Sequence, residues 1–225
     1  MAIKLPAALL GVLALAACAT PEAQQTTAAA PTAAAQQSMA HVHMGHVLTE
    51  WRDTPENRGF LPTAVAEAQV AAQHAGFAAQ RPDDLDWMQM PTRHVLHAVD
   101  PSVEAAGPGL GYGVRQAARG VADHIRFAAD SEGASDNVKL HAHHVATSAT
   151  NVVERVDEIV EVGHQILAAE TAEEAAPLVA RMEELAVQLH EGVDADGDGQ
   201  ITWEEGGLAQ AEQHMGFMVQ GEGMS

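Results

Sequence analysis

The sequence predicts an all-α protein folded as a helical bundle. Of its 225 residues 47% are apolar, enough to bury a core, but only 4% are aromatic. Because strands favour aromatic and β-branched side chains, this Ala-rich composition argues against a β-sandwich or barrel. One long segment also carries an apolar residue at every seventh position, which is the spacing of a seam between packed helices: Val138, Val145, Val152, Ile159 and Ile166.

Residues 1–17 are typical of a secretion signal. Lys4 supplies a positive charge, and the apolar run 5–17 is too short to span a bilayer but suits the core of a signal peptide. The run ends in Leu15-Ala16-Ala17-Cys18, which resembles the lipobox of bacterial lipoproteins. The resemblance implies cleavage before Cys18 and lipidation of its thiol. The alternative is an ordinary signal peptide with an incidental cysteine.

Cysteine usage and charge exclude several classes of protein. Cys18 is the only cysteine, which excludes internal disulfides, cysteine-built zinc sites and a CxxCH haem attachment. A net charge of −20 argues against nucleic acid as a partner and favours cations. Ala19 follows the cysteine where Asp would signal inner-membrane retention, so the lipoprotein resemblance implies the outer membrane. Residues 18–40 are mostly Ala, Gln, Thr and Pro, and we expect a flexible tether holding a periplasmic domain.

Residues 41–177 are predicted to form a His-rich bundle. The Gly-rich segment 107–113 is expected to be a loop, and it lacks the glycine spacing of a phosphate-binding turn. Ser135 is the expected N-cap of the longest helix, and Pro91 and Pro101 are expected to bracket the shortest. The periodicity of apolar residues predicts these helices: 63–80, 93–99, 113–130 and 136–169.

The strongest chemical pattern lies between two helical segments, after a capping-box pattern at Thr171 and Glu174. The helix that begins there carries an apolar stripe made of Leu178, Met182, Leu185 and Leu189. The next segment, 194–205, resembles the EF-hand calcium loop in its alternating Asp residues, central Gly199 and closing Glu205. The resemblance covers residues 178–217. It implies an oxygen-ligated calcium ion held by Asp194, Asp196, Asp198, Gln200, Thr202 and Glu205.

This loop departs from the EF-hand pattern in two ways. EF-hands usually occur in pairs, and the sequence has no second loop for Ile201 to pair with, so Ile201 is expected to pack on the bundle or on a second copy of the chain. Gly206 and Gly207 stand where the exiting helix, on whose first turn we place Glu205, normally has a large apolar residue. We therefore expect a structural or buffering calcium ion, with residues 218–225 as a tail. A lanthanide of similar radius would also suit the loop.

Thirteen histidines form a second pattern. Three pairs have i, i+3 spacing, which places two imidazoles on neighbouring helical turns: His43/His46, His94/His97 and His141/His144. The segment from His74 to Ala79 also recurs as His124 to Ala129, and a His-x-x-His pair follows each copy, so two related helical hairpins are expected. The candidate ligands for a second metal or a b-type haem in the bundle are His74, His94, His97, His124, His141 and His144.

Other interpretations of the histidines stay open. A histidine on an apolar helix face is more often bonded to a carbonyl or carboxylate than to a metal. His141 and His144 lie away from the valine seam, so they need not face the same core as His74. His164, His190 and His214 show no pairing, which favours surface positions. For His41, His43 and His46, at the end of the tether, adventitious metal binding is favoured over a structured site.

These patterns lead to one main functional hypothesis and two alternatives. The main one is a calcium-binding, lipid-anchored periplasmic protein with a single EF-hand. The first alternative is a carrier of copper, zinc, nickel, iron or b-haem that uses the bundle histidines, with Met44, Met215 and Met218 as soft ligands for copper. The second is a calcium-dependent module that contacts an envelope partner. No nucleophile in a recognisable setting indicates an enzymatic reaction.

Overall fold

The computed structural model describes Ala2 and residues 38–224, and the predicted fold class is confirmed there. This part of the chain contains α-helices, one short 3₁₀ helix and no strand: α1 (Met39–Leu48), η1 (Pro55–Asn57), α2 (Phe60–Ala79), α3 (Leu85–Val99), α4 (Val114–Asp130), α5 (Asp136–Ala168), α6 (Ala172–Glu191) and α7 (Leu208–Gly221). None of these helices combines the length and the apolar character that crossing a bilayer requires. The expected signal peptide, Cys18 and most of the tether lie outside the described residues.

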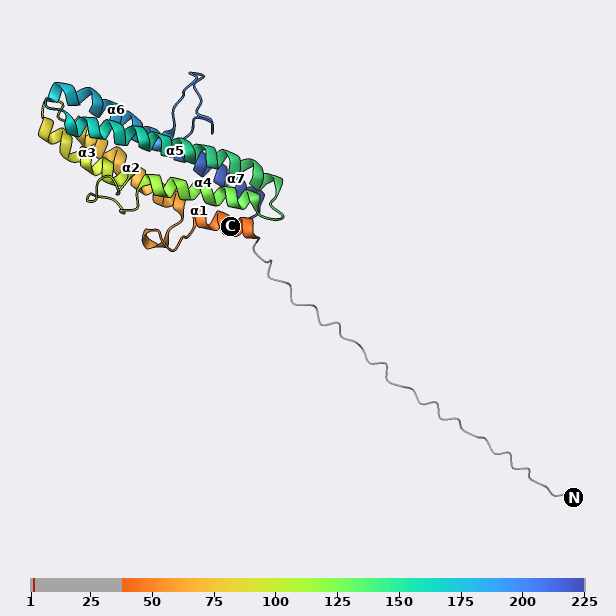
Figure 1. Ribbon diagram of the computed structural model, residues 1–225. Helices are drawn as coiled ribbons and strands as arrows, with labels where there is room; N and C mark the ends of the chain where they lie inside the picture. The colour runs from red at the N-terminus through yellow and green to blue at the C-terminus, as the bar shows by residue number, and fades with distance from the viewer. Residues whose placement is uncertain (1, 3–37, 225) are drawn as a thin grey trace. The chain divides into compact units, whose positions relative to one another are not determined.

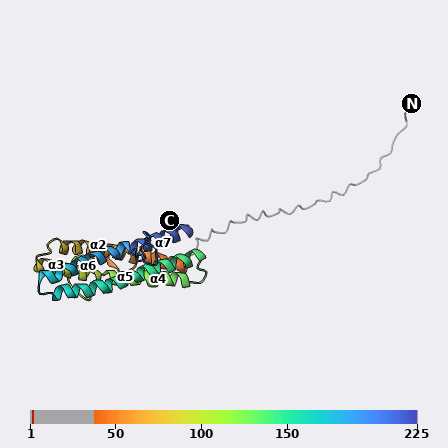
Figure 2. The same cartoon turned by 90° about the horizontal axis from the view of Figure 1, so that it is seen from above.

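The helices of residues 38–224 run side by side around the long helix α5 (Figures 1 and 2). Helix α5 packs against α3, α4, α6 and α7, while α2 packs against α3, α4 and α6. Helix α1 lies on α4 and also touches α2. Short connections at 131–135 and 169–171 make α4–α5 and α5–α6 antiparallel neighbours, as expected for a bundle.

Small residues allow these helices to approach closely. The predicted seam of α5 is buried along its whole length, from Val138 to Ile166. Helix α2 contributes a row of buried alanines to the core, and this row ends at Ala78. At Gly120 of α4 a Cβ atom would come within 2.3 Å of the Phe60 ring, so this crossing requires glycine. Alanine and glycine at the contacts explain how so few aromatic residues can fill a core.

Most predicted helix boundaries in the bundle agree with the structure, but the start of α3 does not. The Ser135 hydroxyl accepts the amide of Val138 at 3.0 Å, which confirms it as the N-cap of α5. Pro91 does not bracket a helix: α3 begins six residues earlier, at Leu85, and Pro91 is buried inside it. The capping carboxylate of Asp84 and the hydroxyl of Thr92, which bonds a carbonyl one turn back, stabilise the helix around the proline.

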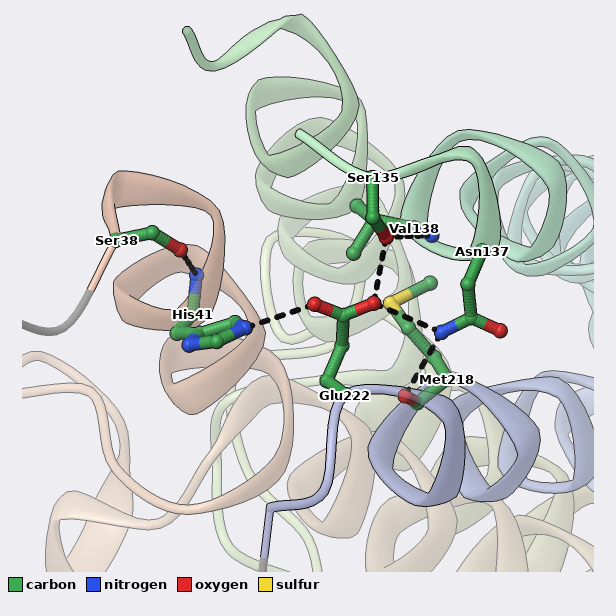
Figure 3. Close-up of polar contacts among 7 residues, drawn as sticks. All are labelled: Ser38, His41, Ser135, Asn137, Val138, Met218 and Glu222. Carbon is green, nitrogen blue, oxygen red and sulfur yellow. Dashed lines mark hydrogen bonds and ion pairs between the residues drawn. The ribbon is translucent and has the colours of Figure 1, made fainter. Parts of the chain in front are cut away.

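The start of α1 is also not part of a tether. The Ser38 hydroxyl caps α1, and the Nε2–H of His41 donates to the Glu222 carboxylate at 3.0 Å, beside the end of α7 (Figure 3). The same carboxylate accepts hydrogen bonds from the Ser135 hydroxyl at 2.5 Å and the Asn137 amide at 3.0 Å. Glu222 therefore joins the first turns of α1 and α5 to the C-terminal end of α7.

Candidate metal centres

Three histidines converge between α1 and α4, and we call them the α1–α4 cluster. They are His43 and His46 on α1 and His124 on α4. The Nδ1 atom of His124 lies 3.2 Å from that of His43 and 3.1 Å from that of His46. The indole of Trp51, from the loop after α1, packs edge-on against His124 with ring centroids 4.8 Å apart. The site is therefore half-buried and partly walled by an aromatic ring.

A second group, the α5–α7 cluster, has the same construction. His141 and His144 on α5 face His214 on α7, whose Nδ1 atom lies 3.0 and 3.3 Å from theirs. Trp203, from the loop that precedes α7, stacks on His144 with centroids 4.4 Å apart and ring planes 18° apart. Each cluster thus takes two ligands from one helix, one from a second helix and an indole from an adjoining loop.

A common sequence pattern underlies both clusters. The helix that gives two ligands carries His-x-x-His, because residues three apart lie on one helical face. The helix that gives one ligand carries His-x-x-Phe, as His124 to Phe127 and as His214 to Phe217. Each phenylalanine ring packs beside the cluster, with centroids 5.4 Å from His43 and 5.5 Å from His141.

Burial and mutual repulsion keep the central imidazole of each cluster neutral. Burial, followed by the charges that His46 and His43 would carry, lowers the pKa of His124 to about 4. Burial and then His144 and His141 lower the pKa of His214 to about 4 as well. Because only neutral imidazole has a lone pair for a metal, the central histidine of each cluster is in its ligating form at neutral pH.

The six histidines proposed from the sequence as one site do not come together. His124 belongs to the α1–α4 cluster, whereas His141 and His144 belong to the α5–α7 cluster. His74 on α2 pairs with His94 on α3 instead, with their Nδ1 atoms 3.2 Å apart. His97 is buried, and its Nδ1 lies 2.8 Å from the carbonyl oxygen of Glu104. The single-site hypothesis is therefore wrong, because the helices distribute these histidines over three pairs of helices.

Three ligands of the two clusters were misjudged from the sequence. For His43 and His46, at the end of the expected tether, adventitious metal binding was favoured over a structured site, but both lie on helix α1. His214 was expected at the surface without a partner, yet it is the central member of the α5–α7 cluster. The signal that points to it is a third His-x-x-Phe copy at 214–217. The methionines considered as soft ligands, Met44, Met215 and Met218, are fully buried in the hydrophobic core.

The acidic loop between α6 and α7 has its own geometry. Asp194, Asp196 and Asp198 each place a carboxylate oxygen within 4.8 Å of the others. Asp194 also accepts the amides of Gly197 and Gly199, at 2.8 and 3.0 Å. From the far end of the loop, Glu205 reaches back to the amide of Ala195 at 2.7 Å. Four carboxylates thus enclose the same stretch of backbone.

The second half of this loop is fixed to α5. The Arg155 guanidinium donates to the carbonyls of Glu205 and Gly206, at 2.7 and 2.9 Å, and Ser148 donates to the carbonyl of Trp203. Ile201 packs against Gly192, at the end of α6. The acidic half, from residue 195 to 200, projects into solvent (Figure 1).

Glu205 does not lie on the first turn of an exiting helix, because α7 begins only at Leu208. Gly206 and Gly207 separate the two, and a Cβ at Gly207 would come 2.7 Å from the carbonyl oxygen of His190. The chain needs glycine there to pass close to the end of α6. The entering helix does end where expected, at Glu191.

No family model, curated protein or solved structure matches this chain. Among the described residues, the histidine and aspartate groups have the spacing needed to hold metal ions.

Proposed function

We propose that this protein binds transition-metal ions, one in the α1–α4 cluster and one in the α5–α7 cluster. The observation that carries the proposal is the convergence of three Nδ1 atoms in each cluster, with the central one 3.0–3.3 Å from the other two. Ligand nitrogens at about 2.0–2.1 Å from a tetrahedral metal stand roughly 3.3 Å apart. Imidazole is a preferred ligand for copper, zinc, nickel and iron, and a three-His set leaves a fourth position open.

Hydrogen bonding alone does not account for the clusters. A neutral imidazole Nδ1 carries either one proton or one lone pair, so it makes one good hydrogen bond. His124 and His214 each place Nδ1 within reach of two other Nδ1 atoms. A shared cation uses the lone pairs of all three nitrogens at once, which protons cannot do.

A haem ligated by two histidines does not fit these clusters. Axial nitrogens on opposite sides of a haem iron stand about 4 Å apart with the flat macrocycle between them. In both clusters the Nδ1 atoms are closer than this and meet directly, with ring centroids 4.5–5.3 Å apart around His214. Single metal ions are therefore favoured over haem.

Titration of the metal-free protein with Zn²⁺ or Cu²⁺ tests this function. We expect two tight equivalents, one of which is lost in His124→Ala and the other in His214→Ala. His164→Ala is the matched control, because His164 is exposed on α5. Retention of both tight equivalents in the two cluster variants would show that the proposal is wrong.

A second candidate function, calcium binding by the acidic loop, is favoured by the position of Glu205. Its carboxylate closes on the start of the loop, where Asp194 lies, so the loop offers calcium the hard oxygen ligands it prefers. The loop is anchored by Arg155, which favours a structural or buffering ion over a switch. In a periplasmic protein lipidated at Cys18, an affinity of about 10⁻⁴–10⁻³ M would suffice.

Two measurements test the calcium proposal and its location. The double variant Asp194→Ala, Glu205→Ala should lose calcium binding by calorimetry, while Glu132→Ala, another exposed acid, should not. Unchanged calcium binding in the double variant would exclude the loop as the site. Radiolabelled palmitate should enter the full chain in cells and be absent from Cys18→Ala, and labelling of that variant would exclude this anchor.

A further inference from the structure

A third pair of helices carries the same sequence pattern as the two clusters. Helix α2 has His-x-x-Phe, as His74 to Phe77, and α3 has His-x-x-His, as His94 to His97. The Nδ1 atoms of His74 and His94 are 3.2 Å apart, as in the clusters, and their rings meet edge-on with centroids 4.7 Å apart. Phe77 packs edge-on against His74 at 5.2 Å, so the aromatic neighbour is present too.

The pair differs from the clusters in one ligand. His97 occupies the position that corresponds to His46 and His144, but its Nδ1 lies 2.8 Å from the carbonyl oxygen of Glu104. Its ring also packs tightly on the loop, since a Cβ at Gly107 would come 2.8 Å from the ring's Cγ atom. The loop between α3 and α4 therefore holds His97 away from His74, and two imidazoles remain.

The two remaining imidazoles are held in place by their helices. The Trp87 indole on α3 donates to the carbonyl of Phe77 on α2 at 2.8 Å, which joins the two helices one turn from His74. Both histidines are half-buried, so an ion between them stays in contact with solvent.

We propose that His74 and His94 form a third transition-metal site, with two protein ligands and the remaining positions open to water or to an external donor. This inference rests on the proposed function, because the same pattern builds all three sites. Two imidazoles hold an ion less firmly than three, so the third site fills after the clusters. It leaves more positions open than either cluster does, so it is the site at which an ion is most readily exchanged with small donor molecules.

The test is a Zn²⁺ titration of the metal-free protein by calorimetry, with saturating Ca²⁺ present to occupy the acidic loop. We expect two tight equivalents and a third that is at least tenfold weaker. His74→Gln and His94→Gln should each remove only the weaker equivalent. His97→Gln, which keeps a donor for the Glu104 carbonyl, and His164→Gln should leave it unchanged.

Each of the other possible results of the zinc titration would contradict a different part of the proposal. No bound zinc in the wild type would overturn the proposed function. Two tight equivalents without a third would leave that function standing and overturn the third site. A weaker equivalent that survives in His74→Gln would place it elsewhere, and its loss in His97→Gln would overturn the two-ligand description. Circular dichroism of each metal-free variant verifies that it is folded.

Discussion

Single residues at the clusters combine two roles, because a histidine ready to bind metal is also one that resists protonation. His124 and His214 have a pKa of about 4, below the value near 6.5 of an unfolded chain. Between these two values the unfolded state binds more protons than the native state. The stability contributed by the neutral rings is therefore complete above pH 6.5 and is lost as the pH falls towards 4.

This linkage predicts acid sensitivity of the metal-free protein. The urea midpoint should fall as the pH is lowered from 7.5 to 4.5, and the fall should be shallower in His124→Gln, where one depressed pKa is removed. His164→Gln serves as the control. Parallel curves for the wild type and His124→Gln would contradict the assignment of the pKa of about 4 to His124.

A buried carboxylate stabilises the loop that holds His97 away from His74 and His94. Glu67 on α2 is fully buried and accepts the amides of Leu110, Tyr112 and Gly113, at 3.1, 2.8 and 2.9 Å. Sequence patterns could not identify this role, because Glu67 stands among alanines on a helix and its partners lie more than forty residues away.

Replacement of this carboxylate should destabilise the protein. In Glu67→Gln one oxygen becomes an NH₂ group facing a backbone N–H, which leaves a buried donor without an acceptor. We expect a loss of roughly 1–3 kcal/mol in the free energy of unfolding, and faster proteolysis within 107–113. Glu132→Gln, at an exposed acid, should change neither the free energy of unfolding nor the rate of proteolysis. Equal stability and equal proteolysis of the two variants would contradict this role for Glu67.

At the scale of elements, amphipathic periodicity is sufficient to predict the long helices α5 and α6 but not the short helix α1. The repeat of valine and isoleucine in α5 and the stripe of α6 predict both helices, and Ser135 predicts where α5 begins. Helix α1 has only ten residues, and its buried face consists of Ala40, Met44 and Val47. Three such positions after an Ala-rich segment are too few to establish a period, so periodicity does not predict a helix over residues 39–48.

Helix α1 depends on tertiary contacts, and Glu222 provides one of them through His41 while it also bonds Ser135 and Asn137 at the start of α5. Ser135, His41 and Asn137 lower the pKa of Glu222, so its carboxylate is ionised and accepts charge-assisted hydrogen bonds at neutral pH. Glu222→Ala should cost roughly 1–3 kcal/mol in the free energy of unfolding. It should also weaken metal binding at the α1–α4 cluster more than at the α5–α7 cluster, as measured by the two tight zinc equivalents. Equal weakening of both would contradict a role for Glu222 in fixing α1.

At the scale of the whole molecule, the sequence contains the pattern of the histidine clusters but not the pairing of the helices. The repeated His-x-x-Phe segments at 74 and 124 and the His-x-x-His pairs were visible as local spacing. Which His-x-x-His pair contacts which His-x-x-Phe segment depends on helix packing. The pair His43/His46 contacts His124, and the pair His141/His144 contacts His214, although 70 to 81 positions of sequence separate these residues. Local periodicity does not determine such long-range choices, which explains why six histidines were grouped as one site.

Because each proposed site joins two helices that are distant in sequence, a bound metal ion would stabilise the whole native fold. An ion in the α1–α4 cluster joins α1 to α4, and one in the α5–α7 cluster joins α5 to α7, so neither arrangement of ligands exists in the unfolded chain. At a free metal concentration of 100 times Kd, each site adds about 2.7 kcal/mol to the free energy of unfolding. Two sites should raise Tm by roughly 10–20 °C in a domain of this size.

Calorimetric melting with and without Zn²⁺ measures this effect, and a chelator should reverse it. His124→Ala and His214→Ala should each retain about half of the increase, because one cluster remains in each variant, while His164→Ala should show all of it. An increase that is the same in the wild type and in both cluster variants would mean that zinc stabilises the bundle at some other place. Loss of the whole increase in either variant would instead mean that the two clusters bind metal as one cooperative unit.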